Sequence, residues 1–107
     1  MTSEPQSWGY DFDCDQSIES LLAAFNAAGP WVWRRRDSDI YGYYLRCEPG
    51  VRAEAAVYRR SQFWTWRTGD RDGFYSALYS EPEARTEIDR VFCSLLQSTN
   101  ATNIIAN

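Results

Sequence analysis

The sequence predicts an α+β fold: a two-layer sandwich in which two helices pack on one face of an antiparallel sheet of four to five strands. Two segments near the ends of the chain repeat apolar residues at steps of three and four, which indicates amphipathic helices. Between them the apolar residues alternate with period two, which indicates strands. The 107 residues fit one domain, and the 5 Trp, 7 Tyr and 5 Phe supply enough apolar surface for a core. We therefore expect a single domain over residues 1–107, with the element order α-β-β-β-β-(β)-α.

The first predicted helix covers residues 16–28. Its apolar positions form one stripe: Ile18, Leu21, Leu22, Phe25 and Ala28. Asp15 or Ser17 is suited to cap its first N–H groups, and Gly29-Pro30 ends it because glycine permits a left-handed turn and proline bars a further helical one. The preceding residues 1–12 have no hydrophobic period, so we expect a loose N-terminal arm that docks, if at all, through its aromatic side chains.

Five strands are predicted in the central segment. They cover residues 31–36, 40–47, 51–60, 62–68 and 74–79. The breaks at 37–39, 48–50 and 69–73 are rich in turn-forming residues, whereas the break near Ser61 is poorly marked. Because the connections are short, an antiparallel meander is favoured.

The second predicted helix begins at residues 80–83 and ends near Gln97. Ser80 and Glu83 have the spacing of a capping box, and Pro82 suits a first helical turn. The apolar stripe of this helix comprises Ala84, Ile88, Val91, Phe92, Leu95 and Leu96. Residues 98–107 are expected to be a polar C-terminal tail, in which Ile104-Ile105 either adds a short edge segment or docks on the domain.

Alternation along the predicted strands divides the sheet into two faces. The face expected beneath the helices carries Trp31, Trp33, Tyr41, Tyr43, Leu45, Cys47, Val51, Ala53, Ala55, Val57, Trp64 and Trp66. The opposite face combines arginine with tyrosine, and its side chains are our candidate partner-binding residues: Arg34, Arg36, Tyr44, Arg46, Arg52, Tyr58, Arg60 and Arg67. Arg and Tyr are enriched in interface hot spots, although the same residues also cover the solvated side of ordinary antiparallel sheets.

Charge is distributed unevenly along the chain. Residues 1–30 carry a net charge of −5, residues 31–71 carry +4 and residues 72–107 carry −3, against −4 overall. A domain of this size is wider than the physiological screening length of about 8 Å, so a ligand on the sheet senses the local positive charge more than the global negative one. The open face therefore favours an anionic or acidic partner.

The composition excludes several classes of catalysis. The chain contains no histidine and no lysine, so all eleven positive charges are arginines. Ser-His-Asp and Cys-His nucleophiles, Schiff-base lysines, phosphate-loop lysines and histidine metal sites therefore need residues that this chain lacks. Cys14, Cys47 and Cys93 are widely spaced, unlike zinc ligands, and the aspartate-rich segment 11–15 is not followed by the glycine and glutamate of a calcium loop. We expect no cofactor and no metal.

These observations predict a small non-catalytic protein-binding module, such as an inhibitor, an immunity protein or a chaperone-like adaptor, that uses the open face. Its partner is expected to be another protein or a second copy of the chain. One alternative is single-stranded nucleic-acid binding on the same face, which the overall acidity disfavours. Another is an enzyme that relies on carboxylates or on a cysteine such as Cys47, whose pKa nearby arginines could lower; without a histidine base, a structural cysteine is favoured.

The location of the protein follows from two further expectations. No apolar run is long enough to span a bilayer, and the N-terminus has no basic stretch followed by an apolar one, as a secretory signal would. We therefore expect a cytoplasmic protein without a membrane partner.

Overall fold

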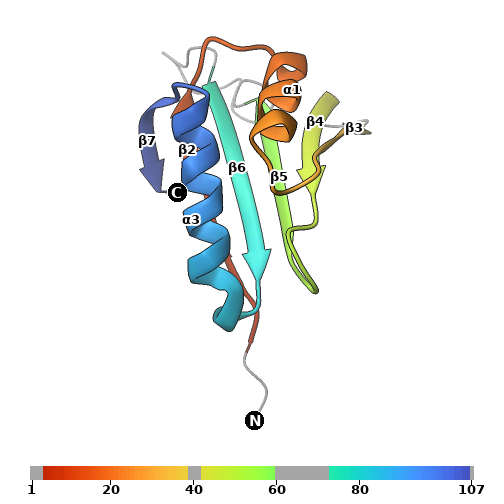
Figure 1. Ribbon diagram of the computed structural model, residues 1–107, viewed down its shortest axis with the longest axis vertical. Helices are drawn as coiled ribbons and strands as arrows, with labels where there is room; N and C mark the ends of the chain where they lie inside the picture. Colours follow the sequence, from red (N-terminus) through yellow and green to blue (C-terminus); the bar gives the residue numbers. More distant parts are fainter. Residues whose placement is uncertain (1–3, 39–41, 60–72, 107) are drawn as a thin grey trace.

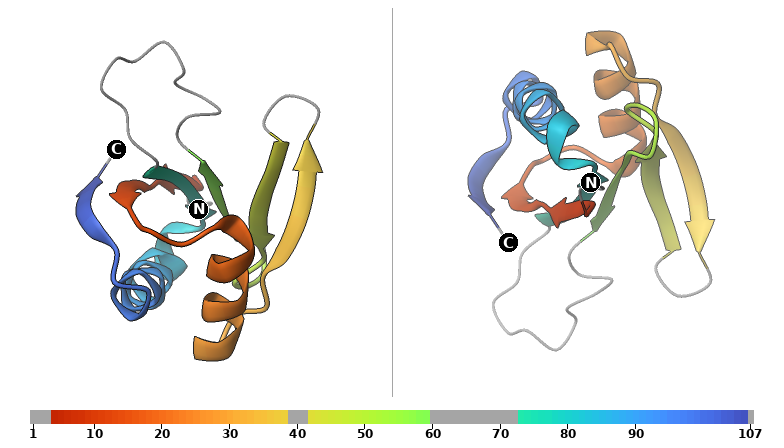
Figure 2. Two further views of the ribbon diagram at one scale, coloured as in Figure 1. Left: turned by 90° about the horizontal axis from the view of Figure 1, so that it is seen from above. Right: turned by 90° about the horizontal axis from the view of Figure 1, so that it is seen from below.

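The computed structural model describes residues 4–38, 42–59 and 73–106, and it confirms the α+β prediction. One antiparallel sheet carries two helices on one face, α1 (Ile18–Ala28) and α3 (Pro82–Ser98). Figure 1 shows both helices in front of the sheet, and Figure 2 shows them on the same side of it when the molecule is turned. The described residues alone form a sheet of seven strands, which is larger than the four to five expected.

The strand order places β3 and β7 at the two edges of the sheet. The order is β3-β4-β5-β6-β2-β7, and β1 pairs with β6. The bounds are β1 Gln6–Trp8, β2 Tyr10–Asp13, β3 Arg34–Ser38, β4 Gly42–Cys47, β5 Glu54–Arg59, β6 Gly73–Ser80 and β7 Thr102–Ala106. The predicted strand 74–79 is therefore the long strand β6, which neighbours β5, β2 and β1. The predicted strand 62–68 lies outside the described residues.

The N-terminal segment was expected to be a loose arm over residues 1–12, but its described part is incorporated in the sheet as β1 and β2. β1 and β2 both pair with β6, and Phe12 is completely buried opposite Phe74. At the interruption between β1 and β2, the Ser76 hydroxyl accepts a hydrogen bond from the Tyr10 N–H (2.9 Å) and donates one to the Tyr10 carbonyl (2.8 Å). Two short strands split in this way give too brief an alternation to be recognised in the sequence.

The described part of the C-terminal segment, residues 98–106, is likewise more than a polar tail. Residues Thr102–Ala106 form β7, which pairs antiparallel with β2 at the edge of the sheet. The edge segment considered for Ile104-Ile105 is therefore present. Both isoleucines remain substantially exposed.

Two strands begin later in the sequence than predicted. β3 begins at Arg34 and continues to Ser38, so part of the expected turn at 37–39 is strand. β5 begins at Glu54, because Arg52 has a left-handed φ of 55° in the turn before it. The turn also places Val51 in solvent, where it is 90% exposed, and corrects its assignment to the buried face.

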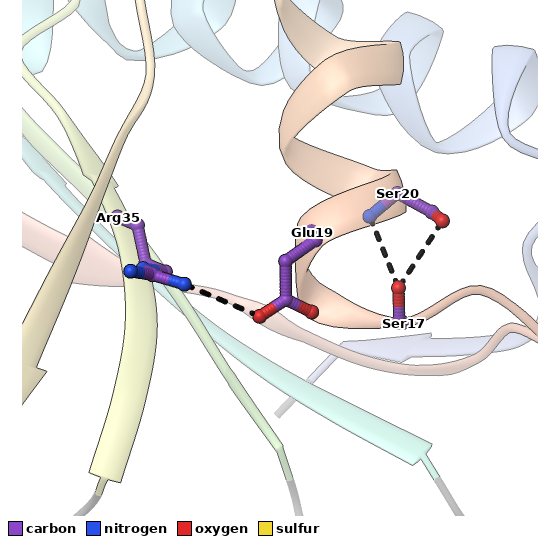
Figure 3. Close-up of polar contacts among 4 residues, drawn as sticks. All are labelled: Ser17, Glu19, Ser20 and Arg35. Atoms are coloured by element: carbon purple, nitrogen blue, oxygen red, sulfur yellow. Dashed lines mark hydrogen bonds and ion pairs between the residues drawn. The ribbon is translucent and has the colours of Figure 1, made fainter.

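The helix ends follow local hydrogen bonding. Ser17, one of the two residues predicted to cap α1, is its N-cap. Its side-chain oxygen accepts a hydrogen bond from the Ser20 N–H at 3.1 Å. Figure 3 shows this cap beside the ion pair of Glu19 in α1 with Arg35 in β3, at 3.4 Å. The capping box predicted for α3 is wrong, because Ser80 is the last residue of β6 and its hydroxyl donates to the Glu81 carbonyl.

The core lies between the helices and the sheet, as the alternation predicted. Trp33 is 2% exposed, and its ring centroid lies 5.0 Å from that of Phe25 in α1 and 6.3 Å from that of Phe92 in α3. Leu45, Cys47, Ala53, Ala55 and Val57 are buried as assigned. Trp31 packs against this core, whereas Tyr43 is exposed, and Tyr41, Trp64 and Trp66 lie outside the described residues. The helices therefore cover one face of the sheet, and the opposite face is open to a partner.

Candidate functional site

Three tyrosines from neighbouring strands form a row on the sheet face opposite the helices. Tyr44 in β4 stacks on Tyr58 in β5, with ring centroids 4.8 Å apart. Tyr58 in turn lies opposite Tyr75 in β6, at a centroid distance of 6.4 Å. We call Tyr44, Tyr58 and Tyr75 the tyrosine ladder; because its members come from three paired strands, the sheet itself fixes their positions.

A hollow lies beside the tyrosine ladder. The next register position pairs Ala56 with Ala77, and both side chains are too small to fill the space above the sheet. Beyond them, Glu54 lies opposite Tyr79. The resulting hollow has a volume of about 340 Å³. We call it the tyrosine hollow; its larger polar and aromatic side chains are Trp8, Tyr44, Tyr58, Tyr75, Tyr79, Arg46 and Glu54.

Arg46 has its charge compensated within the chain. Its guanidinium group donates to Glu54 at 2.7 Å and to Glu48 at 3.3 Å. The hydrogen bond to Glu54 is the main cause of a raised pKa of Arg46. Arg46 is therefore a wall of the hollow that is already engaged with two carboxylates, which weakens the prediction that it meets an anionic partner.

Two other predicted arginines lie free at the edge of the sheet. Arg34 and Arg36 in β3 are exposed, and neither forms an ion pair or a side-chain hydrogen bond with any residue that the structure describes. Arg34 is the register partner of Arg46, and like charges in directly opposite positions are destabilising. Among the described residues, this pair of exposed positive charges therefore has no counter-charge in an ion pair.

These arginines line a second depression of about 600 Å³, which we call the arginine groove. Trp31 and Val32 form its apolar part, and Val32 is 71% exposed. Arg34, Arg36, Arg46 and Glu48 contribute its charged part. Because Arg46 lines both depressions, the groove and the tyrosine hollow adjoin on one continuous surface.

The structure brings together five of the eight predicted residues. Tyr44, Arg46 and Tyr58 line the hollow, and Arg34 and Arg36 line the groove. Arg52 lies apart, because its turn directs it to an ion pair with Glu81 at 3.2 Å. Arg60 and Arg67 lie outside the described residues.

Sequence reasoning missed three aromatic residues of the hollow: Trp8, Tyr75 and Tyr79. The alternation used to assign the two faces of the sheet did not extend to the strand 74–79. The signal was nevertheless present, since β6 alternates between buried and partly or fully exposed side chains along most of its length. Tyr75, Ala77 and Tyr79 therefore share the face of the tyrosine ladder.

No activated nucleophile lies on this surface among the residues that the structure describes. Burial raises the pKa of the Cys47 thiol to about 12 and outweighs the opposing effect of Arg46, so the suggested activation by arginine does not occur. Tyr10 also has a raised pKa, through burial and its hydrogen bond to Asp89. The described ranges contain no group of three His, Cys, Asp or Glu side chains suited to a metal ion.

The comparisons with known proteins give no family for this chain. No protein-family model matches it, and no curated protein matches it in sequence. Neither helix of the described residues is long and apolar enough to cross a membrane.

Proposed function

We propose that this chain is a non-catalytic binding module that holds a partner protein on its open sheet face. The tyrosine hollow is the observation that carries the proposal: four tyrosines surround a small floor, and the adjoining groove carries Arg34 and Arg36, which form no ion pair with the described residues. Tyr and Arg supply much of the binding energy of protein interfaces when they line a pocket that a partner side chain can fill. An inhibitor, an immunity protein or an adaptor would use such a face.

A protein partner fits this surface better than single-stranded nucleic acid. Nucleic-acid platforms offer free aromatic faces to the bases, whereas the rings of Tyr44 and Tyr58 stack on each other. Glu48 and Glu54 lie beside the same rings and would repel phosphates. Nucleic-acid binding is therefore kept as an outcome of the test.

The test fills the hollow without changing charge. Ala77→Trp places a large ring on the hollow floor, and Ala23→Trp, on the exposed side of α1, is the matched control. Affinity purification from the native cell identifies the partner, and calorimetric titration of the purified partner then measures its affinity. We expect Ala77→Trp to weaken binding about tenfold or more, with Ala23→Trp unchanged. Both variants should retain a free energy of unfolding within about 1 kcal/mol of the parent.

Three results separate the alternatives. Equal affinity of the Ala77→Trp variant and the parent would refute the hollow as the binding site. Binding of an oligonucleotide with a steep salt dependence, about 0.7 in the log–log slope per phosphate contact, would replace the protein partner by nucleic acid. A dimer in sedimentation equilibrium that Ala77→Trp dissociates would identify the partner as a second copy of the chain.

A further inference from the structure

We infer that the arginine groove binds an extended acidic segment of the partner, which pairs as an additional strand along the outer edge of β3. In this arrangement the carboxylates of the added strand lie against Arg34 and Arg36. The inference rests on the proposed function, because it names the chemistry that the partner brings to the same surface.

The outer edge of β3 can accept a further strand. Within the described ranges β3 pairs with β4 alone and lies at the outer edge of the sheet (Figure 1). Each edge strand presents a row of N–H and C=O groups that can pair with another chain. Peptides recognised by strand addition gain affinity from these backbone bonds and specificity from alternate side chains.

The spacing of Arg34 and Arg36 matches the period of an added strand. Arg34 and Arg36 are two residues apart on one strand, so both point to the open face. An added strand has the same period of two, so acidic residues at alternate positions can face both arginines at once. Arg35 points to the other face, where it pairs with Glu19 and lies 4.4 Å from the ring centroid of Tyr43.

Charged residues on an outer strand are ordinarily explained as protection of the sheet edge against aggregation with other chains. The opposite edge of this sheet argues against it. β7 has no charged residue in Thr102–Ala106 and exposes Ile104 and Ile105, so the chain leaves its more apolar edge without charge. The arginines of β3 are instead placed beside a groove with an exposed apolar part, Trp31 and Val32. This combination fits a segment that alternates acidic and apolar residues.

The experiment uses the full chain and a short synthetic peptide that alternates Glu and Val, with blocked ends. Heteronuclear NMR follows the binding affinity and the hydrogen exchange of the β3 amides. Two control peptides carry Gln in place of Glu or N-methyl groups on the amides along one edge. Arg36→Glu is compared with Arg90→Glu, which makes the same charge change on the exposed surface of α3. Circular dichroism verifies that both variants are folded.

We expect the Glu-Val peptide to bind and to protect those β3 amides that point away from β4. The Gln peptide, the N-methylated peptide and the Arg36→Glu variant should each bind about tenfold more weakly or worse, and Arg90→Glu should bind as the parent does. Binding that survives N-methylation would overturn strand addition. Protection of β7 amides in place of those of β3 would overturn the choice of edge.

Failure of this inference is distinguishable from failure of the proposed function. If Ala77→Trp abolishes capture of the native partner while Arg36→Glu leaves it unchanged, the open face binds a partner but β3 does not receive an acidic strand. If Ala77→Trp has no effect, the proposed function itself fails.

Discussion

Asp89 holds the N-terminal strands on α3, and its removal should destabilise the whole domain. One of its carboxylate oxygens accepts hydrogen bonds from the Trp8 indole N–H at 2.9 Å and from the Tyr10 hydroxyl. A hydrogen bond to a charged group contributes about 1.5–3 kcal/mol. Because both donors are only partly buried, water can replace some of this energy in the variant. We therefore expect Asp89→Ala to lower the free energy of unfolding by about 2–4 kcal/mol.

Urea denaturation of four proteins measures this effect: the parent, Asp89→Ala, Tyr10→Phe and the double variant. Tyr10→Phe keeps the ring, whose centroid lies 6.2 Å from that of Phe92, and removes only the hydroxyl donor. The difference between the double variant and the sum of the single ones isolates the Tyr10–Asp89 interaction. We expect a coupling energy of about 1 kcal/mol or more.

The structure also predicts where the destabilisation appears. Amides of β1 and β2 should lose protection from hydrogen exchange before those of β5, because Asp89 joins the former strands to α3. Two results together would refute this role of Asp89: effects of the two single substitutions that simply add in the double variant, and a decrease in the free energy of unfolding below about 0.5 kcal/mol for Asp89→Ala. A change that small is usual for a surface substitution and requires no specific contact.

Two further predictions concern the core. Trp33→Ala should lower the free energy of unfolding by about 3–5 kcal/mol. With an unfolding entropy of about 0.2 kcal/mol/K for a domain of this size, the melting temperature should fall by about 15–25 °C. A fall of only a few degrees in calorimetry would contradict the central position of Trp33. The buried Cys47 thiol has a pKa of about 12 against an ordinary 9.0, so the unfolded chain loses its proton first as pH rises and stability should decline between these values. Urea titrations from about pH 8 to about pH 11 should show a shallower decline in Cys47→Ala, and native Cys47 should react slowly with iodoacetamide at neutral pH.

The long periodic segments were predictable because burial imposes a regular spacing on them. Each helix shows a stripe that repeats over several turns, and the buried residues of both lie on that stripe. β5 alternates over enough residues to assign Ala55 and Val57 to the core. These signals depend on local geometry alone, so the sequence contains them in full.

The strands at both chain ends were not predictable to the same degree. β1 has three residues and β2 has four, too few for an alternation to be distinguished from chance. Their stability comes from pairing with β6 and from Asp89, residues that are distant in the sequence. Tertiary contacts of this kind leave no local pattern.

The sequence predicted which face of the sheet carries the candidate site, but not which of its arginines are paired with carboxylates. Alternation placed Tyr44, Arg46 and Tyr58 on the open side. Alternation also placed Glu54 on this side as an ion-pair partner, but it did not indicate which arginine it would engage. In the described residues Glu54 and Glu48 both bind Arg46, and Arg34 and Arg36 form no ion pair, because that division depends on side-chain reach across the sheet. The left-handed φ of Arg52 was also enough to move this predicted residue away from the candidate binding surface.

Phenylalanine and tyrosine differ in their burial in this domain. All four described phenylalanines are completely buried, whereas none of the described tyrosines is. A tyrosine ring can pack on its neighbours and still present its hydroxyl group to water or to a partner, so a tyrosine-lined surface remains compatible with solvent when it is unoccupied. A row of phenylalanines at the same positions would form an exposed apolar patch and promote association. The tyrosine ladder therefore provides the large contact area that a specific partner needs, without the cost in solubility that the same area would otherwise bring.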